Sequence, residues 1–138
     1  MTIFETEEDL RREKKAIELF VSLFKGSYRK LDPLDIDFKI YDKNSDLVGY
    51  VEVKGRLRNM SNAYPLQISA RKLIKLLDKR MKAIVVWACD DGIIYANPMN
   101  LRGDIKWGGR AVRENSTNDL EMMVYYDRQK EFKYVRYP

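Results

Sequence analysis

Residues 34–56 read LDIDFKIYDKNSDLVGYVEVKGR, and this stretch decides the fold. Apolar and polar residues alternate near both of its ends, which predicts two strands with one buried face each. The polar residues 43–46 between them suit a hairpin turn. If Tyr41 lies opposite Val48, the same register places Asp37 directly opposite Glu52.

This predicted pairing of Asp37 with Glu52 carries an electrostatic cost. Directly opposed residues on neighbouring strands have Cβ atoms roughly 5 Å apart. Two carboxylates at that distance repel each other unless a cation lies between them. The hairpin therefore indicates a divalent metal site, with Lys54 on the same face of the strand as Glu52.

Composition limits both the metal and the partner. The chain has no histidine, which excludes histidine-ligated zinc and Ser-His-Asp catalysis. Its one cysteine, Cys89, lies in the apolar run AIVVWAC and is interpreted as a buried strand residue. Ligands that are oxygens only favour Mg²⁺ or Mn²⁺. The net charge of +5 favours an acidic partner, nucleic acid first, although many soluble proteins are mildly basic.

Length and hydropathy predict one domain over residues 1–138. No apolar run approaches the roughly 20 residues that a membrane span needs, and the acidic N-terminus is not that of a signal peptide. We therefore expect a cytoplasmic protein with no membrane partner.

A first helix is predicted over residues 7–24, with Thr6 as its N-cap. Glu13 lies in the middle of the apolar stripe of this helix. A carboxylate on a buried face is costly unless it binds a metal or pairs with a lysine or arginine, and both interpretations remain open.

After the hairpin, Arg56 and Arg58 lie on a loop that we interpret as mobile and able to meet phosphate. A second helix is predicted over residues 65–82, with a largely basic outer face that includes Lys72 and Lys75. These two lysines are candidates for phosphate contact, and plain solvation is the alternative. The predicted apolar stripe of this helix consists of Ile68, Leu73, Ile74, Leu77 and Met81.

The C-terminal part begins with a doubly buried strand over residues 83–88, a turn and a returning strand over residues 93–96. Residues 102–118 are predicted to be a surface binding loop, in which Arg110 and Arg113 reach phosphate. Trp107 either stacks on a base or anchors this loop, and anchoring is the preferred interpretation. Residues 122–126 and 132–137 are predicted as closing strands around a turn at 127–130.

Together the acids and Lys54 indicate hydrolysis of a phosphodiester. A divalent cation lowers the pKa of a bound water and neutralises charge on phosphorus. A neighbouring lysine can orient that water and stabilise the transition state.

The order of these residues resembles the PD-(D/E)xK nuclease superfamily, in particular its small phage-type or Holliday-junction-resolvase-like members. The matching residues are Glu13, Asp37 within LDIDF, and Glu52-Val53-Lys54 within YVEVKGR, and Gln67, Ser69 or Lys72 match a basic or amide position on the helix that follows. The resemblance implies an α/β fold, with a central mixed β-sheet flanked by helices and a restriction-endonuclease-like αβββαβ core with extra C-terminal strands.

It also implies metal-dependent cleavage of DNA, in which Asp37, Glu52 and the Val53 carbonyl hold Mg²⁺ or Mn²⁺. Glu13 would assist a second ion, and Lys54 would act on the attacking water. Many such enzymes are homodimers, which the sequence leaves open. A phage-encoded member would work in the host cytoplasm.

Three alternatives stay open. Pro33 precedes Asp35 more closely than Asp37, so Asp35 is the rival metal ligand, although the register favours Asp37 and would pair Asp35 with Lys54. The chain is also compatible with a nucleic-acid-binding module that does not cleave. A structural protein, such as a virion component, is the third alternative.

Overall fold

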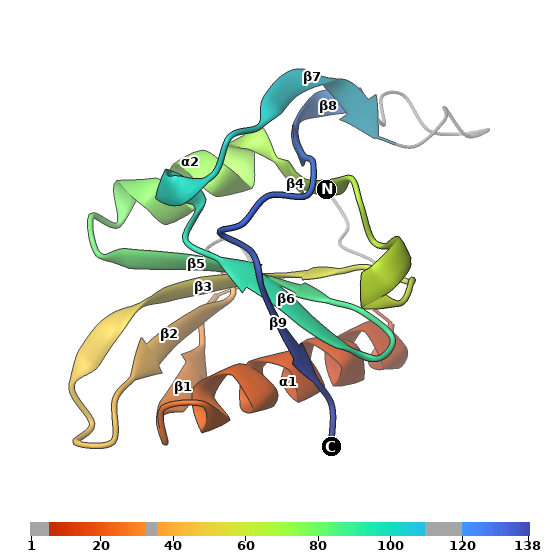
Figure 1. Cartoon of the computed structure of the whole chain (residues 1–138). Helices are drawn as coiled ribbons and strands as arrows, with labels where there is room; N and C mark the ends of the chain where they lie inside the picture. Colours follow the sequence, from red (N-terminus) through yellow and green to blue (C-terminus); the bar gives the residue numbers. More distant parts are fainter. Residues whose placement is uncertain (1–5, 33–35, 110–119) are drawn as a thin grey trace.

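The computed structural model describes residues 6–32, 36–109 and 120–138, and Figure 1 shows its layers. Two helices, two short 3-10 helices and nine strands form in these residues. In chain order they are α1 (Glu7–Ser22), β1 (Ser27–Lys30), β2 (Phe38–Tyr41), β3 (Leu47–Gly55), η1 (Met60–Asn62), β4 (Leu66–Ser69), α2 (Ala70–Asp78), β5 (Lys82–Ala88), β6 (Gly92–Ala96), η2 (Pro98–Asn100), β7 (Asp104–Gly109), β8 (Leu120–Tyr126) and β9 (Lys133–Arg136).

A six-stranded sheet in the order β1-β2-β3-β5-β6-β9 forms the centre of the molecule. It is mixed, because β3 and β5 run parallel while their outer neighbours are antiparallel. Helix α1 covers one face, and α2 with a three-stranded sheet, β4-β8-β7, lies over the other (Figure 1). The predicted α/β fold with a mixed central sheet is confirmed.

Strand β5 belongs to both core layers. Ile84 and Val86 pack on the α1 side, while Val85 and Trp87 pack on the α2 side. Because every second side chain of a strand points to the same face, a continuous apolar run is what a strand covered on both faces needs. The doubly buried strand was predicted correctly from that run.

Helix α1 begins where expected and ends slightly early. The Thr6 hydroxyl accepts from the backbone N–H of Asp9, and the Asp9 carboxylate accepts from the Thr6 N–H, which completes a capping box. The helix ends at Ser22 rather than at residue 24. Its buried face places Ile17 and Phe20 against the sheet.

The predicted hairpin register holds over most of its length. Phe38 pairs with Val51 and Ile40 with Gly49, which is the expected register. It shifts at Tyr41, which lies opposite Leu47 instead of Val48. This irregularity is at the turn end of the hairpin, away from Asp37, so the prediction for the acids is unaffected by it.

The alternation of the first strand fails at its start. Ile36 was predicted to share a face with Phe38, but it is fully buried in the layer beneath α2, whereas Phe38 packs against α1. Strand β2 begins only at Phe38, so Ile36 is not held to the pleat of the sheet. Asp37 thus lies where the chain passes from one core layer to the other.

The second helix is shorter than predicted. Residues 66–69 form strand β4, in which Leu66 and Ile68 are buried in pairing with β8, and α2 begins at Ala70. The predicted stripe is confirmed at Leu73 and Leu77, which pack against the core, but it is wrong at Ile74, which is 67% exposed. It also left out Leu76, which is fully buried. Pairing with a distant strand outweighed the local helical pattern.

Two further predictions for the C-terminal part are wrong. The first half of the expected loop, residues 104–109, is the edge strand β7, and Trp107 on it is 69% exposed rather than an anchor. Strands β8 and β9 do not pair with each other, because β8 lies between β4 and β7 and β9 pairs with β6. Neither helix in the described part of the chain is long and apolar enough to cross a membrane.

Candidate metal centre

A pocket of about 440 Å³ opens where β3 and β5 end. Ligands of open α/β sheets bind at this carboxyl edge of the parallel strands, because the loops and helix ends there converge around a crevice. Residues of seven elements, α1, β1, β3, β4, α2, β5 and β8, and of the segment between β1 and β2 form its wall. Among the lining residues are Arg12, Glu13, Lys30, Asp37, Glu52, Val53, Lys54, Ser69, Arg71, Lys72, Lys75 and Glu121.

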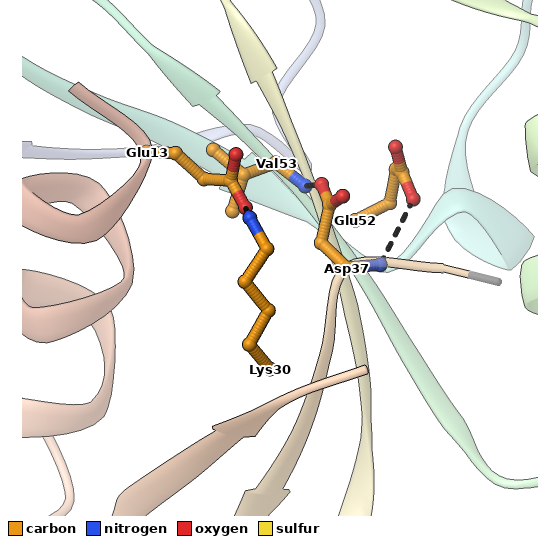
Figure 2. Close-up of polar contacts among 5 residues, drawn as sticks. All are labelled: Glu13, Lys30, Asp37, Glu52 and Val53. Carbon is orange, nitrogen blue, oxygen red and sulfur yellow. Dashed lines mark hydrogen bonds and ion pairs between the residues drawn. The ribbon is translucent and has the colours of Figure 1, made fainter. Parts of the chain in front are cut away.

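Asp37 is positioned by the early end of the β2–β3 ladder. Strand β2 begins at Phe38, which pairs with Val51 of β3. The Val53 N–H, two residues further along β3 and also directed towards β2, therefore has no partner in that strand. The Asp37 Oδ2 atom accepts from this N–H at 2.8 Å (Figure 2). In return, the backbone N–H of Asp37 donates to Glu52 Oε1 at 3.3 Å. The two acids therefore lie side by side, as the register predicted.

Glu52 is a buried carboxylate, only 6% exposed. Its neighbours Val51 and Val53 pack against α1, so the Glu52 side chain points to the α2 face. Burial, and then the charge of Asp37, raise the pKa of Glu52 to about 8. Burial likewise raises the pKa of Asp37, even though Lys72 and Lys30 favour its charged form. Near neutral pH the pair therefore holds a proton. A divalent cation can take the place of that proton between the two carboxylates.

Glu13 lies on the other side of the sheet. Its carboxylate, with the side chain 12% exposed, accepts from Lys30 Nζ at 2.7 Å (Figure 2). Of the two open interpretations, pairing with a lysine is therefore the one observed. Glu13 reaches the pocket from the α1 face of the sheet and Glu52 from the α2 face. Within the described ranges, no group of three or more acidic or cysteine side chains is arranged to hold a metal ion.

The basic side chains of the pocket come mainly from β3 and α2. Lys54 is exposed and shares the face of Glu52, two positions along the strand. The Ser69 hydroxyl caps α2 by accepting from the Lys72 N–H at 3.2 Å, which sets the direction in which the helix leaves the pocket. Lys72 acts on both acids electrostatically, and Lys75 lines the same wall.

Comparison with known families agrees with this arrangement. Residues 2–135 match the model of one family, described as "Phage putative PDDEXK endonuclease". The chain belongs to this family. No curated protein and no solved structure matches it.

Membership of the PDDEXK family confirms the resemblance drawn from the hairpin and extends it to nearly the whole chain. It assigns the protein to a family of phage proteins that resemble PD-(D/E)xK nucleases. It also gives the acid pair its context, because PD-(D/E)xK nucleases generally use divalent metals.

The residues of this family member fit a hard cation. Asp37 and Glu52 offer carboxylate oxygens, and the Val53 carbonyl faces the same strand edge as its N–H, because the two groups of one residue point the same way. Cys89 is 1% exposed and away from the pocket lining. Two carboxylates with waters and phosphate oxygens form a usual Mg²⁺ environment.

The remaining candidates have four different outcomes. The Nε of Arg56 donates to the Ala63 carbonyl at 2.7 Å, so the loop that we expected to be mobile is anchored there. The phosphate contact of Arg56 stays a prediction. Arg58 lies outside the pocket. Gln67 contributes its backbone, since its carbonyl accepts from Trp87 Nε1 at 2.9 Å. Asp35, Arg110 and Arg113 lie outside the described residues.

Lys30 and Arg12 are among the pocket residues that sequence reasoning missed. Lys30, the partner of Glu13, lies on a short strand whose pattern did not mark it as a site residue. Arg12 donates to the Ala88 carbonyl at 3.3 Å and pairs with Asp90 at 3.0 Å. Arg12 and Glu13 follow Asp9 by three and four residues, a spacing that places the three side chains on one side of the helix, and this was the available signal.

Proposed function

We propose that this protein is a Mg²⁺- or Mn²⁺-dependent endonuclease that hydrolyses phosphodiester bonds of DNA. The observation that carries the proposal is the pair of Asp37 and Glu52, two adjacent carboxylates with raised pKa values in a basic pocket. A fold stabilised only by packing gains nothing from such a pair, because burial and mutual repulsion both oppose its ionisation.

The proposed roles follow the contacts. Asp37, Glu52 and the Val53 carbonyl would hold the cation. When bound, the cation activates water and neutralises charge that develops on phosphorus. Lys54, exposed on the face of Glu52, would orient the attacking water and stabilise the transition state. Glu13 would contribute to a second ion only by giving up its bond with Lys30.

The substrate proposal rests on charge. Arg71, Lys72 and Lys75 from α2 and Lys54 from β3 line one pocket, and a phosphodiester backbone is the anion that matches such a surface. DNA is proposed over RNA from the family's description as a phage endonuclease of the PDDEXK type. The charge of the pocket fits both backbones, so the comparison with RNA below tests this choice.

A cleavage panel tests the proposal. Duplex, branched and single-stranded DNA and matched RNA are incubated with Mg²⁺, Mn²⁺ or EDTA, and products are resolved on denaturing gels. We expect metal-dependent cleavage of DNA, reduced at least about a hundredfold in Glu52→Gln and in Lys54→Met. Lys43→Met, which removes an exposed lysine in the hairpin turn, is the matched control and should cleave like wild type.

Unchanged cleavage in both site variants would show that the acid pair is not the active site. Binding of DNA with no cleavage in either metal would favour the non-cleaving module. Neither binding nor cleavage would favour the structural protein.

A further inference from the structure

The loop between β3 and β4 is rigidly attached to the rest of the fold. Besides the bond from Arg56 to Ala63, the Met60 N–H donates to Asp91 Oδ1 at 2.8 Å, and the Met60 side chain is 7% exposed. The Asp90 N–H donates to the Arg58 carbonyl at 2.9 Å. Figure 1 shows η1 at the end of the sheet where β5 turns into β6. The outward side of this loop is therefore a fixed surface.

Two adjoining hollows open on that surface, of about 600 and about 320 Å³, and they share Ser61. Arginine side chains from three separate segments line them, and we call these the arginine patch: Arg58, Arg128 and Arg136. Neutral hydrogen-bonding side chains complete the lining, namely Asn59, Ser61, Asn62, Tyr64 and Tyr134.

The three guanidinium groups keep much of their capacity for an external anion. Arg128 lies over the Tyr64 ring at 4.6 Å, a contact that orients the group without neutralising it. Arg136 approaches Asp91 at 3.6 Å, but its side chain is 78% exposed. Asp91 is also the acceptor for Met60. Arg58 is exposed, and within the described part of the chain no carboxylate forms an ion pair with it.

One member of the patch, Arg58, lies close to the candidate active site. Arg58 follows Lys54 by four residues, so their Cα atoms are at most about 14 Å apart. Arg12 lines the active-site pocket and pairs with Asp90, whose N–H bonds to Arg58. One strand of B-DNA presents a phosphate about every 3.4 Å along its axis. A strand at the acid pair would therefore reach the patch within a few nucleotides.

We propose that the arginine patch is a second binding site for the nucleic-acid phosphate backbone, which holds the substrate a few nucleotides from the scissile bond. The inference rests on the proposed function for the identity of the ligand. Planar guanidinium groups pair with phosphate oxygens in a bidentate manner, and the amide and hydroxyl groups between them donate to the same oxygens. Such contacts fix position and affinity without reading the base sequence.

Metal-free binding separates this site from catalysis. Affinity for a 20-base-pair duplex is measured in EDTA by fluorescence anisotropy at several salt concentrations. The patch variant is Arg58→Gln/Arg128→Gln/Arg136→Gln. The matched control is Lys25→Gln/Lys43→Gln/Lys82→Gln, which removes the same charge from exposed residues at the opposite edge of the sheet. A third variant changes the three arginines to lysine, and thermal melting verifies that all variants fold.

We expect the patch variant to bind at least tenfold more weakly near 0.1 M salt. The slope of log affinity against log salt should become shallower by about 2 to 3, since each phosphate contact contributes about 0.9. The control should keep the wild-type slope, and the lysine variant should largely keep it because charge is retained.

Equal losses in the patch variant and the control would assign the effect to net charge and overturn the proposal, as would a patch variant that binds like wild type. Wild-type protein that binds through the patch but never cleaves would contradict the proposed function and leave the patch standing. Wild-type protein that does not bind DNA would contradict both.

Discussion

At the scale of single residues, Asp37 has two tasks that a substitution can separate. Its carboxylate accepts from the Val53 N–H, which stabilises the end of the hairpin, and it adds a negative charge beside Glu52. The first task needs only an oxygen acceptor, whereas binding a cation needs the charge as well.

Asp37→Asn should therefore fold with near wild-type stability but lose metal binding and cleavage. Asp37→Ala should also lose metal binding and cleavage. In addition, its unfolding free energy should fall by about 1 to 2 kcal/mol, because the Val53 N–H is left without its acceptor. Urea denaturation in EDTA measures the stability, and calorimetric titration with Mn²⁺ measures the binding. Equal stability of the two variants would mean that the hydrogen bond to Val53 contributes nothing.

The raised pKa of Glu52 predicts an unusual dependence of the protein's stability on pH. Its pKa is raised to about 8 in the folded protein from an ordinary value of 4.5, so the folded state holds the proton more tightly than the unfolded state. This contribution is complete below pH 4.5 and is lost as the pH rises towards 8. Each pKa unit is worth about 1.4 kcal/mol, so the loss amounts to a few kcal/mol at most.

In EDTA, the melting temperature of wild type relative to Glu52→Gln should consequently fall between about pH 5 and pH 8. The amide keeps the size and one acceptor oxygen of the side chain but cannot ionise. The comparison removes the contributions of all other titrating groups that the two proteins share. A difference in melting temperature that stays constant over this range would contradict the raised pKa.

At the scale of elements, the hairpin was predictable because its signal is local. Alternation and turn chemistry lie within one short stretch, and they were enough to predict the register at Phe38 and the closeness of Asp37 to Glu52. Strand β4 was missed since its partner β8 lies more than fifty residues further along the chain. Strand β7 was missed for a different reason: Ile105 and Trp107 on it are exposed, so burial imposes no pattern on the edge strand.

The N-terminal end of α2 contributes both to the stability of the fold and to the wall of the candidate metal centre. Ser69 caps the helix through the Lys72 N–H, and it is 6% exposed. Ser69→Ala should lower the unfolding free energy by about 1 kcal/mol and allow the first turn to fray. Because that turn carries Arg71 and Lys72, metal-free DNA binding should weaken severalfold.

Thr6→Ala removes the comparable cap of α1 and is the control. It should lower stability by a similar amount, measured by urea denaturation, without the change in DNA affinity. Equal weakening of binding by the two variants would show that α2 has no special part in it.

At the scale of the whole molecule, the strand order was beyond sequence reasoning. The buried run of β5 indicated a central strand, but it did not tell which strands would flank it. Strands β8 and β9 follow each other in the chain and join different sheets, so the simplest hairpin assumption failed. The pairing of Glu13 with Lys30 was equally hidden, since it depends on how α1 crosses the sheet.

Metal binding should be visible in the stability of the entire fold. A cation that binds only the folded protein adds about 2.7 kcal/mol at one hundred times its dissociation constant. For a chain of this size, differential scanning calorimetry should show a rise in melting temperature of roughly 5 to 15 °C with Mg²⁺ or Mn²⁺. Glu52→Gln should show almost none, and a wild-type protein that melts identically with and without either cation would exclude a resident metal.

Asp37 lies between two residues anchored in different places, Ile36 in the layer beneath α2 and Phe38 in the layer beneath α1. Moving the backbone of Asp37 away from Glu52 would withdraw one of these side chains from its core, which is costly. The backbone at the site is therefore held in place from both sides. The excess charge of the pair is relieved by a proton or a cation, so loading the metal should leave the backbone where it already is.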